Sequence, residues 1–191
     1  MRPAVFLDRD GVFNVHPKIV VKRWADFEWL PGAREALVKL NLPNVRTCLA
    51  TNQPTVGMGI TKRRQIEALH AELVAAIAAA GGRLDRVEAS YGVLSRRRKP
   101  NSGMLEDAAA AFAAAGAPID KSRAVMVGDK PKDAQAAAGF GIPAILLATT
   151  HTEADLHEAI HSHGLRDVCI VADLAEAVAE ILERFGPEDK P

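Results

Sequence analysis

The sequence predicts an α/β protein with a Rossmann-like, doubly wound and mostly parallel sheet. First, strand-like and helix-like segments alternate along nearly the whole chain. Second, the apolar runs 4–7, 48–50 and 124–127 are continuous, as in parallel strands that are buried on both faces. Third, each run ends on polar residues, and binding sites of open α/β sheets form beyond the carboxyl ends of the strands.

The first half of the chain predicts three strands and two helices. The expected strands are residues 4–7, 46–51 and 86–91. Pro31 marks the start of the first helix, because proline is favoured in a first turn, and Thr61 is the expected N-cap of the second. Between the first strand and Pro31 the pattern is weak, and residues 19–21 and 27–29 are the segments that could pair as a small hairpin.

The second half of the chain repeats the alternation with three strands and four helices. The strands are expected to end at Gly128, Leu147 and Val171, and the helices to begin near Ser102, Pro131, Thr152 and Asp173. No insertion after the first or the second strand is long enough for a large cap domain. We therefore expect a single domain over residues 1–186 and a short frayed tail at 187–191.

Composition restricts the class of protein. Hydrophobic residues make up 48% of the 191 residues, enough for a buried core, and the net charge is zero, whereas a general nucleic-acid binder would carry a basic excess. Cys48 and Cys169 lie in apolar runs and predict buried thiols of a reducing compartment. We expect no signal peptide, and the sequence holds no apolar run of about 18 residues. We expect a cytoplasmic monomer or small homo-oligomer that has no membrane contact.

Three carboxylates are expected to meet at one edge of the sheet. Asp8 and Asp10 follow the first strand, and Asp129 follows the fourth. Two unit charges about 4 Å apart repel by about 4 kcal/mol at an effective dielectric constant of about 20. A bound cation would offset this repulsion, so we expect one in the cluster. Magnesium accepts carboxylates together with phosphate oxygens, and it would leave Asp8 as a nucleophile and Asp10 as an acid and base. Two acids in such a pattern usually form an ordinary turn, but the preceding strand and Gly11 favour a site.

Other polar residues at strand ends fit phosphate chemistry. Thr51 ends the second strand, and Lys99 brings a positive charge to a helix start whose free N–H groups favour an anion. Asp133 follows Asp129 by four residues and is expected to orient its neighbours without binding the metal. Alone, Lys99 would more often belong to a solvated basic loop, and the segment 128–133 fits an ordinary helix N-terminus equally well.

Taken together, these segments resemble the haloacid dehalogenase (HAD) superfamily of aspartyl-phosphate phosphatases. The branch with the strongest resemblance holds the histidinol-phosphate phosphatases and the heptose 1,7-bisphosphate phosphatases. The matching segments are Phe6-Leu7-Asp8-Arg9-Asp10-Gly11-Val12, Leu30-Pro31-Gly32, Thr51-Asn52-Gln53, Arg98-Lys99-Pro100 with Gly103-Met104, and Gly128-Asp129-Lys130 with Asp133. Each segment alone is weakly specific, but five in the right order, within residues 4–148, are strongly specific.

The resemblance implies a role for individual positions. Asp8 would form the aspartyl-phosphate, and Asp10 would protonate the leaving oxygen and then activate water. Thr51 and Lys99 would hold the phosphoryl oxygens. The implied magnesium ligands are Asp8, the backbone carbonyl of Asp10, and Asp129, and the implied substrate contacts are Asn52, Arg98 and Lys130.

Two segments depart from the pattern of this branch. Its members usually carry a zinc loop of three cysteines and one histidine before the Arg-Lys-Pro motif, but residues 92–98 contain neither residue type, so no structural zinc is expected. The segment 54–59 also lacks the arginine that relatives often have there. Both departures affect specificity and leave the catalytic residues in place.

The sequence thus predicts a magnesium-dependent phosphatase that acts on a small phosphorylated metabolite, with a sugar bisphosphate as the first candidate. The alternatives are histidinol phosphate, a 3′-phosphorylated nucleic-acid end, a phosphotransferase, and a binding module that has lost turnover. The basic run 96–99 is compatible with a nucleic acid, but the neutral net charge makes it an unexpected partner.

Overall fold

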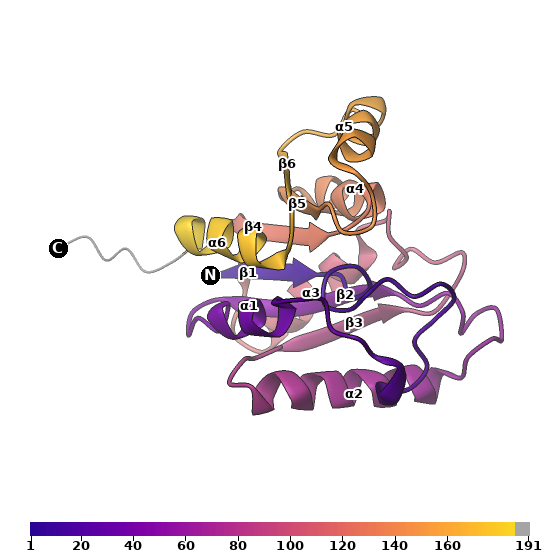
Figure 1. Cartoon of the computed structure of the whole chain (residues 1–191). Coiled ribbons are helices and arrows are strands. Elements are labelled where there is room, and N and C mark those ends of the chain that lie inside the picture. Colours follow the sequence, from indigo (N-terminus) through magenta and orange to yellow (C-terminus); the bar gives the residue numbers. More distant parts are fainter. Residues whose placement is uncertain (186–191) are drawn as a thin grey trace.

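The computed structural model describes residues 1–185, which form one six-stranded parallel sheet with helices on both faces (Figure 1). The strands are β1 (Arg2–Leu7), β2 (Arg46–Asn52), β3 (Arg86–Ser90), β4 (Ile119–Gly128), β5 (Ala144–Leu147) and β6 (Val168–Val171). Their spatial order is β3-β2-β1-β4-β5-β6. The chain therefore builds outward from β1 in one direction and then in the other, which confirms the predicted doubly wound sheet.

Within residues 1–185, three α-helices cover each face of the sheet. The helices are α1 (Ala33–Lys39), α2 (Arg63–Ala79), α3 (Gly103–Ala114), α4 (Pro131–Phe140), α5 (Glu153–Ser162) and α6 (Leu174–Phe185). Val5 and Leu7 of β1 pack in one core with α1, α2 and α6, whereas Ala4 and Phe6 pack in the other with α3, α4 and α5. Successive strand residues point to opposite faces, so a strand between two helix layers must be apolar throughout.

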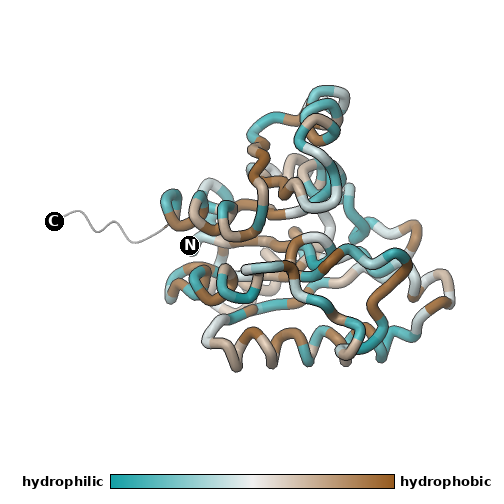
Figure 2. Tube along the Cα trace, in the orientation of Figure 1, coloured by the Kyte–Doolittle hydropathy of each residue, from teal (hydrophilic) through white to brown (hydrophobic). Residues whose placement is uncertain are grey.

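The amphipathic pattern of α2 places this helix against the sheet. Brown and teal segments alternate along it in Figure 2, and its buried positions include Ile66, Leu69, Leu73 and Ile77. The helix begins at Arg63 after Lys62, so the prediction of Thr61 as N-cap was wrong. The Thr61 hydroxyl instead lies 3.0 Å from that of Thr55, because the preceding loop folds back and the Thr61 N–H donates to the Thr55 carbonyl.

The predicted hairpin between residues 19–21 and 27–29 was also wrong. In the described chain, residues 19–21 form no strand, and a 3₁₀ helix, η1 (Trp24–Asp26), stands where the hairpin would turn. Trp29 instead makes an antiparallel bridge with Asn14. Stacking of Trp24 on Phe27, with ring centroids 4.8 Å apart, compacts the segment without a strand pair.

Some predictions concern the end of the chain. Gly186 and the predicted frayed tail at 187–191 lie outside the described residues. Among residues 1–185, no helix has both the length and the apolar character that crossing a membrane requires.

Candidate active site

The predicted site residues gather at the carboxyl edge of the sheet, where the strand order reverses direction. Leu7 is in register with Leu49 of β2 and with Val127 of β4. The next residues therefore emerge side by side, and they include Asp8, Thr51 and Asp129. A crevice at such a switch point is where open α/β sheets bind their ligands.

A buried lysine joins two of the carboxylates. Lys99 is 1% exposed, and its Nζ lies 2.9 Å from Asp8 Oδ2 and 2.6 Å from Asp133 Oδ1. Burial opposes the charge of Lys99, but the two carboxylates outweigh it and hold its pKa above the usual value. Burial likewise opposes the charge of Asp8, but Lys99 and Lys132 keep the pKa of Asp8 below its usual value. Asp8 is therefore ionised at neutral pH.

The backbone of Lys99 is fixed by Asn52 at the end of β2. The Asn52 side chain donates to the Lys99 carbonyl at 2.9 Å and accepts from the Lys99 N–H at 3.0 Å. This pair of hydrogen bonds ties the 92–101 loop to the sheet. The substrate contact of Asn52 stays a prediction, whereas the structure shows its side chain bound to the lysine backbone.

Asp133 lies fully buried in the first turn of α4. One of its oxygens pairs with Lys99, and the other accepts from the Lys130 N–H at 3.1 Å. Burial raises the pKa of Asp133 to about 6, against the attraction of Lys99 and with added repulsion from Asp8. Gly128 makes room for this carboxylate, because a Cβ there would lie 2.3 Å from the Asp133 Cβ.

Asp129 has one buried oxygen that no described residue engages. Its Oδ2 accepts from the Thr150 hydroxyl and lies 3.5 Å from Lys130 Nζ, whereas its buried Oδ1 has no partner among the described residues. Burial and the charge of Asp8 raise the pKa of Asp129. One carboxylate oxygen from each of Asp8, Asp129 and Asp133 lies within 4.8 Å of the others. An unpaired buried oxygen in an all-oxygen cluster fits a hard divalent cation.

Asp10 is held by three neighbouring side chains. Arg9 donates to both of its oxygens, from Nη2 at 2.9 and 3.0 Å and from Nε at 3.2 Å. Asn14 donates to Oδ1 at 3.0 Å, and Gln53 lies at 3.4 Å from Oδ2. Gln53 also donates to the Thr51 hydroxyl at 3.2 Å.

A cavity of about 170 Å³ opens at Asp8 and Asp10. Five predicted site residues line it, namely Asp8, Asp10, Asn52, Arg98 and Lys130. The other predicted site residues are absent from this lining and almost completely buried, namely Thr51, Lys99, Asp129 and Asp133. His16 and Lys132, which the sequence did not single out, also line it, and the His16 ring contacts Lys130 Nζ.

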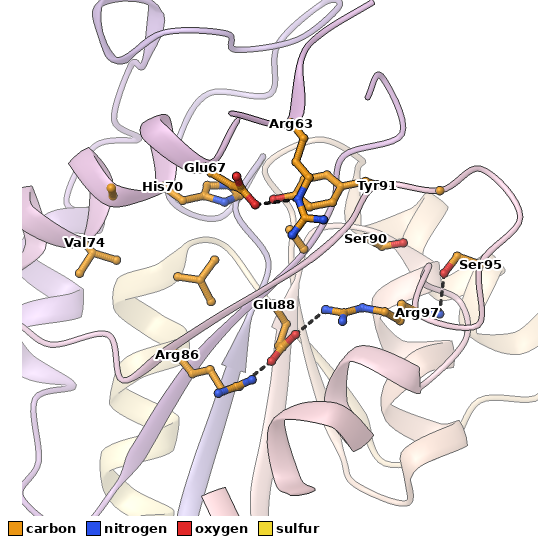
Figure 3. Close-up of a pocket in the computed structure, with 14 residues that line it drawn as sticks. Arg63, Glu67, His70, Val74, Arg86, Glu88, Ser90, Tyr91, Ser95 and Arg97 are labelled. Carbon is orange, nitrogen blue, oxygen red and sulfur yellow. Dashed lines mark hydrogen bonds and ion pairs between the residues drawn. The ribbon is translucent and has the colours of Figure 1, made fainter. Parts of the chain in front are cut away.

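A larger cavity of about 780 Å³ lies elsewhere, along the outer edge of β3 (Figure 3). In the close-up, Arg63, Glu67 and His70 of α2 lie on one side, and on the other Arg86 and Glu88 of β3 form a linked ion-pair chain with Arg97. None of the three clustered carboxylates lines it. Its size therefore does not make it the active site.

Sequence reasoning missed the side chains that hold the site together. Three of these residues lie inside or beside the matching segments, namely Arg9, Asn14 and Gln53. That proximity could have indicated a role in the site. His70 falls on the buried face of α2, four residues after Ile66, where a polar residue among apolar ones indicates a specific partner. The contact between His70 and Arg9 spans 61 residues, so the local sequence does not indicate the partner.

We predict that Gly11→Ala destabilises the protein and disturbs Asp129. Gly11 has a φ of +83°, and a Cβ there would lie 2.2 Å from Asp129 Oδ2. Gly32→Ala is the matched control, since Gly32 has a similar φ of +71° but nothing within 4 Å of the added atom. In urea unfolding, the free energy of unfolding should fall by about 1 kcal/mol for the control, from backbone strain alone. It should fall by at least about twice as much for Gly11→Ala, because the added Cβ also meets Asp129. Equal losses would mean that Asp129 moves aside without cost.

Comparison with known proteins agrees with this geometry. The HAD-hydrolase-like family matches residues 96–177. The chain is 36% identical over 200 residues to the D-glycero-D-manno-heptose-1,7-bisphosphate 7-phosphatase of Thermosynechococcus vestitus, covering 97% of this chain and 98% of the relative. It is 34% identical to the corresponding β-anomer enzyme of Rhodopseudomonas palustris, over 74% of this chain and 81% of that one.

Solved structures show the same likeness. The D,D-heptose 1,7-bisphosphate phosphatase of B. bronchiseptica, crystallised with magnesium and phosphate, matches with a TM-score of 0.81 at 29% identity, over 95% of this chain and 98% of that one. The enzyme from Burkholderia thailandensis matches with a TM-score of 0.63 at 27% identity, over 95% of this chain and 99% of that one. With the sequence relatives, these matches show that the chain belongs to the HAD-like hydrolases, in the heptose-1,7-bisphosphate 7-phosphatase family.

Proposed function

We propose that this protein is a magnesium-dependent heptose 1,7-bisphosphate 7-phosphatase that works through an aspartyl-phosphate. The observation that carries the proposal is the buried Asp8–Lys99 pair beside the unpartnered oxygen of Asp129. An ionised carboxylate, a buried cation and a free metal-binding oxygen in one crevice are what phosphoryl transfer to a carboxylate requires. The substrate comes from the family to which the chain belongs.

Asp8 is the nucleophile in this proposal. Its Oδ1 accepts from the Arg9 N–H at 2.8 Å and its Oδ2 pairs with Lys99, so the carboxylate is held in one orientation where it lines the cavity. Attack on phosphorus forms the aspartyl-phosphate and releases the sugar oxygen. Orientation of this kind contributes to rate because the reacting atoms need no further ordering.

Asp10 is the acid and base. It lines the same cavity as Asp8 and gives a proton to the leaving oxygen as the P–O bond breaks. It then takes a proton from the water that hydrolyses the aspartyl-phosphate. Arg9, Asn14 and Gln53 hold its two oxygens and thereby aim the carboxyl group.

Thr51 and Lys99 stabilise the negative charge on the transferred group. Gln53 already donates to the Thr51 hydroxyl oxygen, so the hydroxyl hydrogen is available for a phosphoryl oxygen. When bound by Asp8, Asp129 and the Asp10 carbonyl, magnesium would neutralise charge on the phosphoryl oxygens. Asp133 orients Lys99, since its two oxygens already have partners on Lys99 and Lys130. We propose no structural zinc, since residues 92–98 hold neither cysteine nor histidine.

The cavity is too small to enclose a whole sugar bisphosphate and suits one phosphoryl group with its nearest atoms. Its volume is about 170 Å³, and the rest of the substrate would lie across the rim. Arg98, Lys130 and Lys132 place three cations there. They would attract the second phosphate, so we expect a preference for a bisphosphate over a monophosphate.

Phosphate release from a substrate panel tests this proposal. We would compare heptose 1,7-bisphosphate with histidinol phosphate, a sugar monophosphate and a 3′-phosphorylated oligonucleotide, with magnesium or with a chelator. Alcohol acceptors added to the same assay reveal phosphotransfer. A magnesium-dependent preference for the bisphosphate supports the proposal. A preference for the oligonucleotide, or equal turnover of all substrates, would overturn the substrate assignment.

We predict that magnesium stabilises the folded protein through Asp129. Millimolar magnesium should raise the melting temperature of the wild type, because an ion that binds only the folded state stabilises it by mass action. Asp129→Asn should lose most of this shift, since the amide carries no charge. The same substitution at Asp155, an exposed N-terminal residue of α5, is the control and should keep the shift. An unchanged shift in Asp129→Asn would place the metal elsewhere.

A further inference from the structure

We infer that His70 is a positioning residue that acts through Arg9 to orient the Asp10 carboxyl group. The inference rests on the proposed role of Asp10 as acid and base. His70 lies on α2 and is 4% exposed, and its Nε2 lies 3.1 Å from Arg9 Nη1. It belongs to none of the segments that carry the family resemblance.

The identities of the two side chains determine the direction of the hydrogen bond. A guanidinium group has only donors, so Arg9 Nη1 must donate and His70 Nε2 must accept. The ring is then neutral and carries its hydrogen on Nδ1. Burial and the charge of Arg9 lower the pKa of His70 to about 3, which is consistent with a ring that stays neutral at physiological pH.

Arg9 is fully buried and is held at more than one edge. Its Nη1 contacts His70, while its Nε and Nη2 donate to Asp10. A guanidinium group is planar and rigid, so fixing Nη1 also fixes the directions of the two groups that contact Asp10. Without His70, the buried Nη1 would lose this partner, and the guanidinium group could rotate to seek another.

The location of His70 gives the contact a second consequence. His70 lines the 780 Å³ cavity beside β3 and is labelled there next to Glu67 in Figure 3. Asp10 lines the catalytic cavity instead. Arg9 therefore connects a residue of one cavity with a residue of the other. A substitution at His70 can change the orientation of Asp10 without replacing any residue that lines the catalytic cavity.

Leaving-group dependence provides the kinetic test. The value of kcat/KM should be measured for wild type and His70→Leu with a series of alkyl and aryl phosphate monoesters. Alkyl leaving groups need a proton from Asp10, whereas 4-nitrophenolate leaves without one. We expect His70→Leu to lower kcat/KM about tenfold for the alkyl esters and less than about twofold for 4-nitrophenyl phosphate. His70→Gln, whose amide oxygen can accept from Arg9, should recover most of the loss.

A purely structural defect would lower both classes of ester equally, and that result, or no change in either class, overturns the inference. The tautomer provides a test that needs no turnover. Nitrogen-15 NMR of the imidazole ring should show a neutral His70 with its hydrogen on Nδ1 between pH 5 and 8. A hydrogen on Nε2 would contradict the Arg9 contact. If the wild type hydrolyses neither these esters nor heptose 1,7-bisphosphate, the proposed function fails, whereas the NMR result still decides the contact.

Discussion

Asp8→Asn is expected to lower phosphate release by at least about a thousandfold and to leave the fold intact. The amide cannot attack phosphorus to form the acyl phosphate. The fold should persist because Lys99 keeps its ion pair with Asp133 at 2.6 Å. Phosphate release and thermal unfolding, measured on the same preparation, separate the two effects.

Asp85→Asn is the matched control for this variant. Asp85 also belongs to a partly buried ion pair, with Arg83, but it precedes β3 at the amino end of the sheet, opposite the site. We expect near wild-type turnover there with some loss of stability. Turnover by Asp8→Asn within about tenfold of wild type would rule out the aspartyl-phosphate route through this residue.

The fold was predictable because its signals are local. A strand between two helix layers must be apolar throughout, and residues 4–7 and 124–127 are. The same runs predicted that Asp8 and Asp129 lie at one edge of the sheet, because the carboxyl ends of parallel strands meet at the same edge. The gathering of these acids therefore followed from strand boundaries alone.

The failures and omissions share a different cause. The segment 19–29 was expected to pair with itself, but Trp29 pairs with Asn14 and the aromatic rings stack on one another. Lys99 in isolation suggested a solvated basic loop, yet it is 1% exposed because Asn52 binds its backbone and two carboxylates surround its amine. Such contacts join residues far apart in sequence, and spacing along the chain does not encode them.

Removing the buried cation should have the second large effect. In the wild type, Lys99 Nζ lies 2.9 Å from Asp8 and 2.6 Å from Asp133. In Lys99→Met, methionine has about the same length as lysine but no positive charge to neutralise these two carboxylates. We expect activity to fall by at least about a hundredfold, because the transferred group loses a charge-stabilising donor. Breaking a buried ion pair on one side should lower the free energy of unfolding by about 3–5 kcal/mol. Lys39→Met, at an exposed lysine of α1, should change it by less than about 0.5 kcal/mol.

The pH dependence of this loss identifies the charges involved. In the wild type, the raised pKa of Lys99 means that its contribution is complete below about pH 10 and disappears as pH rises through the folded-state pKa. The lowered pKa of Asp8 means that its contribution is present above about pH 4 and disappears as pH falls through its folded-state value. Without the lysine cation, Asp8 and Asp133 keep their protons to higher pH, and ionising them in the folded protein costs free energy. The difference in free energy of unfolding between wild type and Lys99→Met should therefore grow between pH 5 and pH 8. Urea unfolding in chelator at several pH values measures it. A deficit independent of pH would mean that packing, and not charge, accounts for the role of Lys99 in stability.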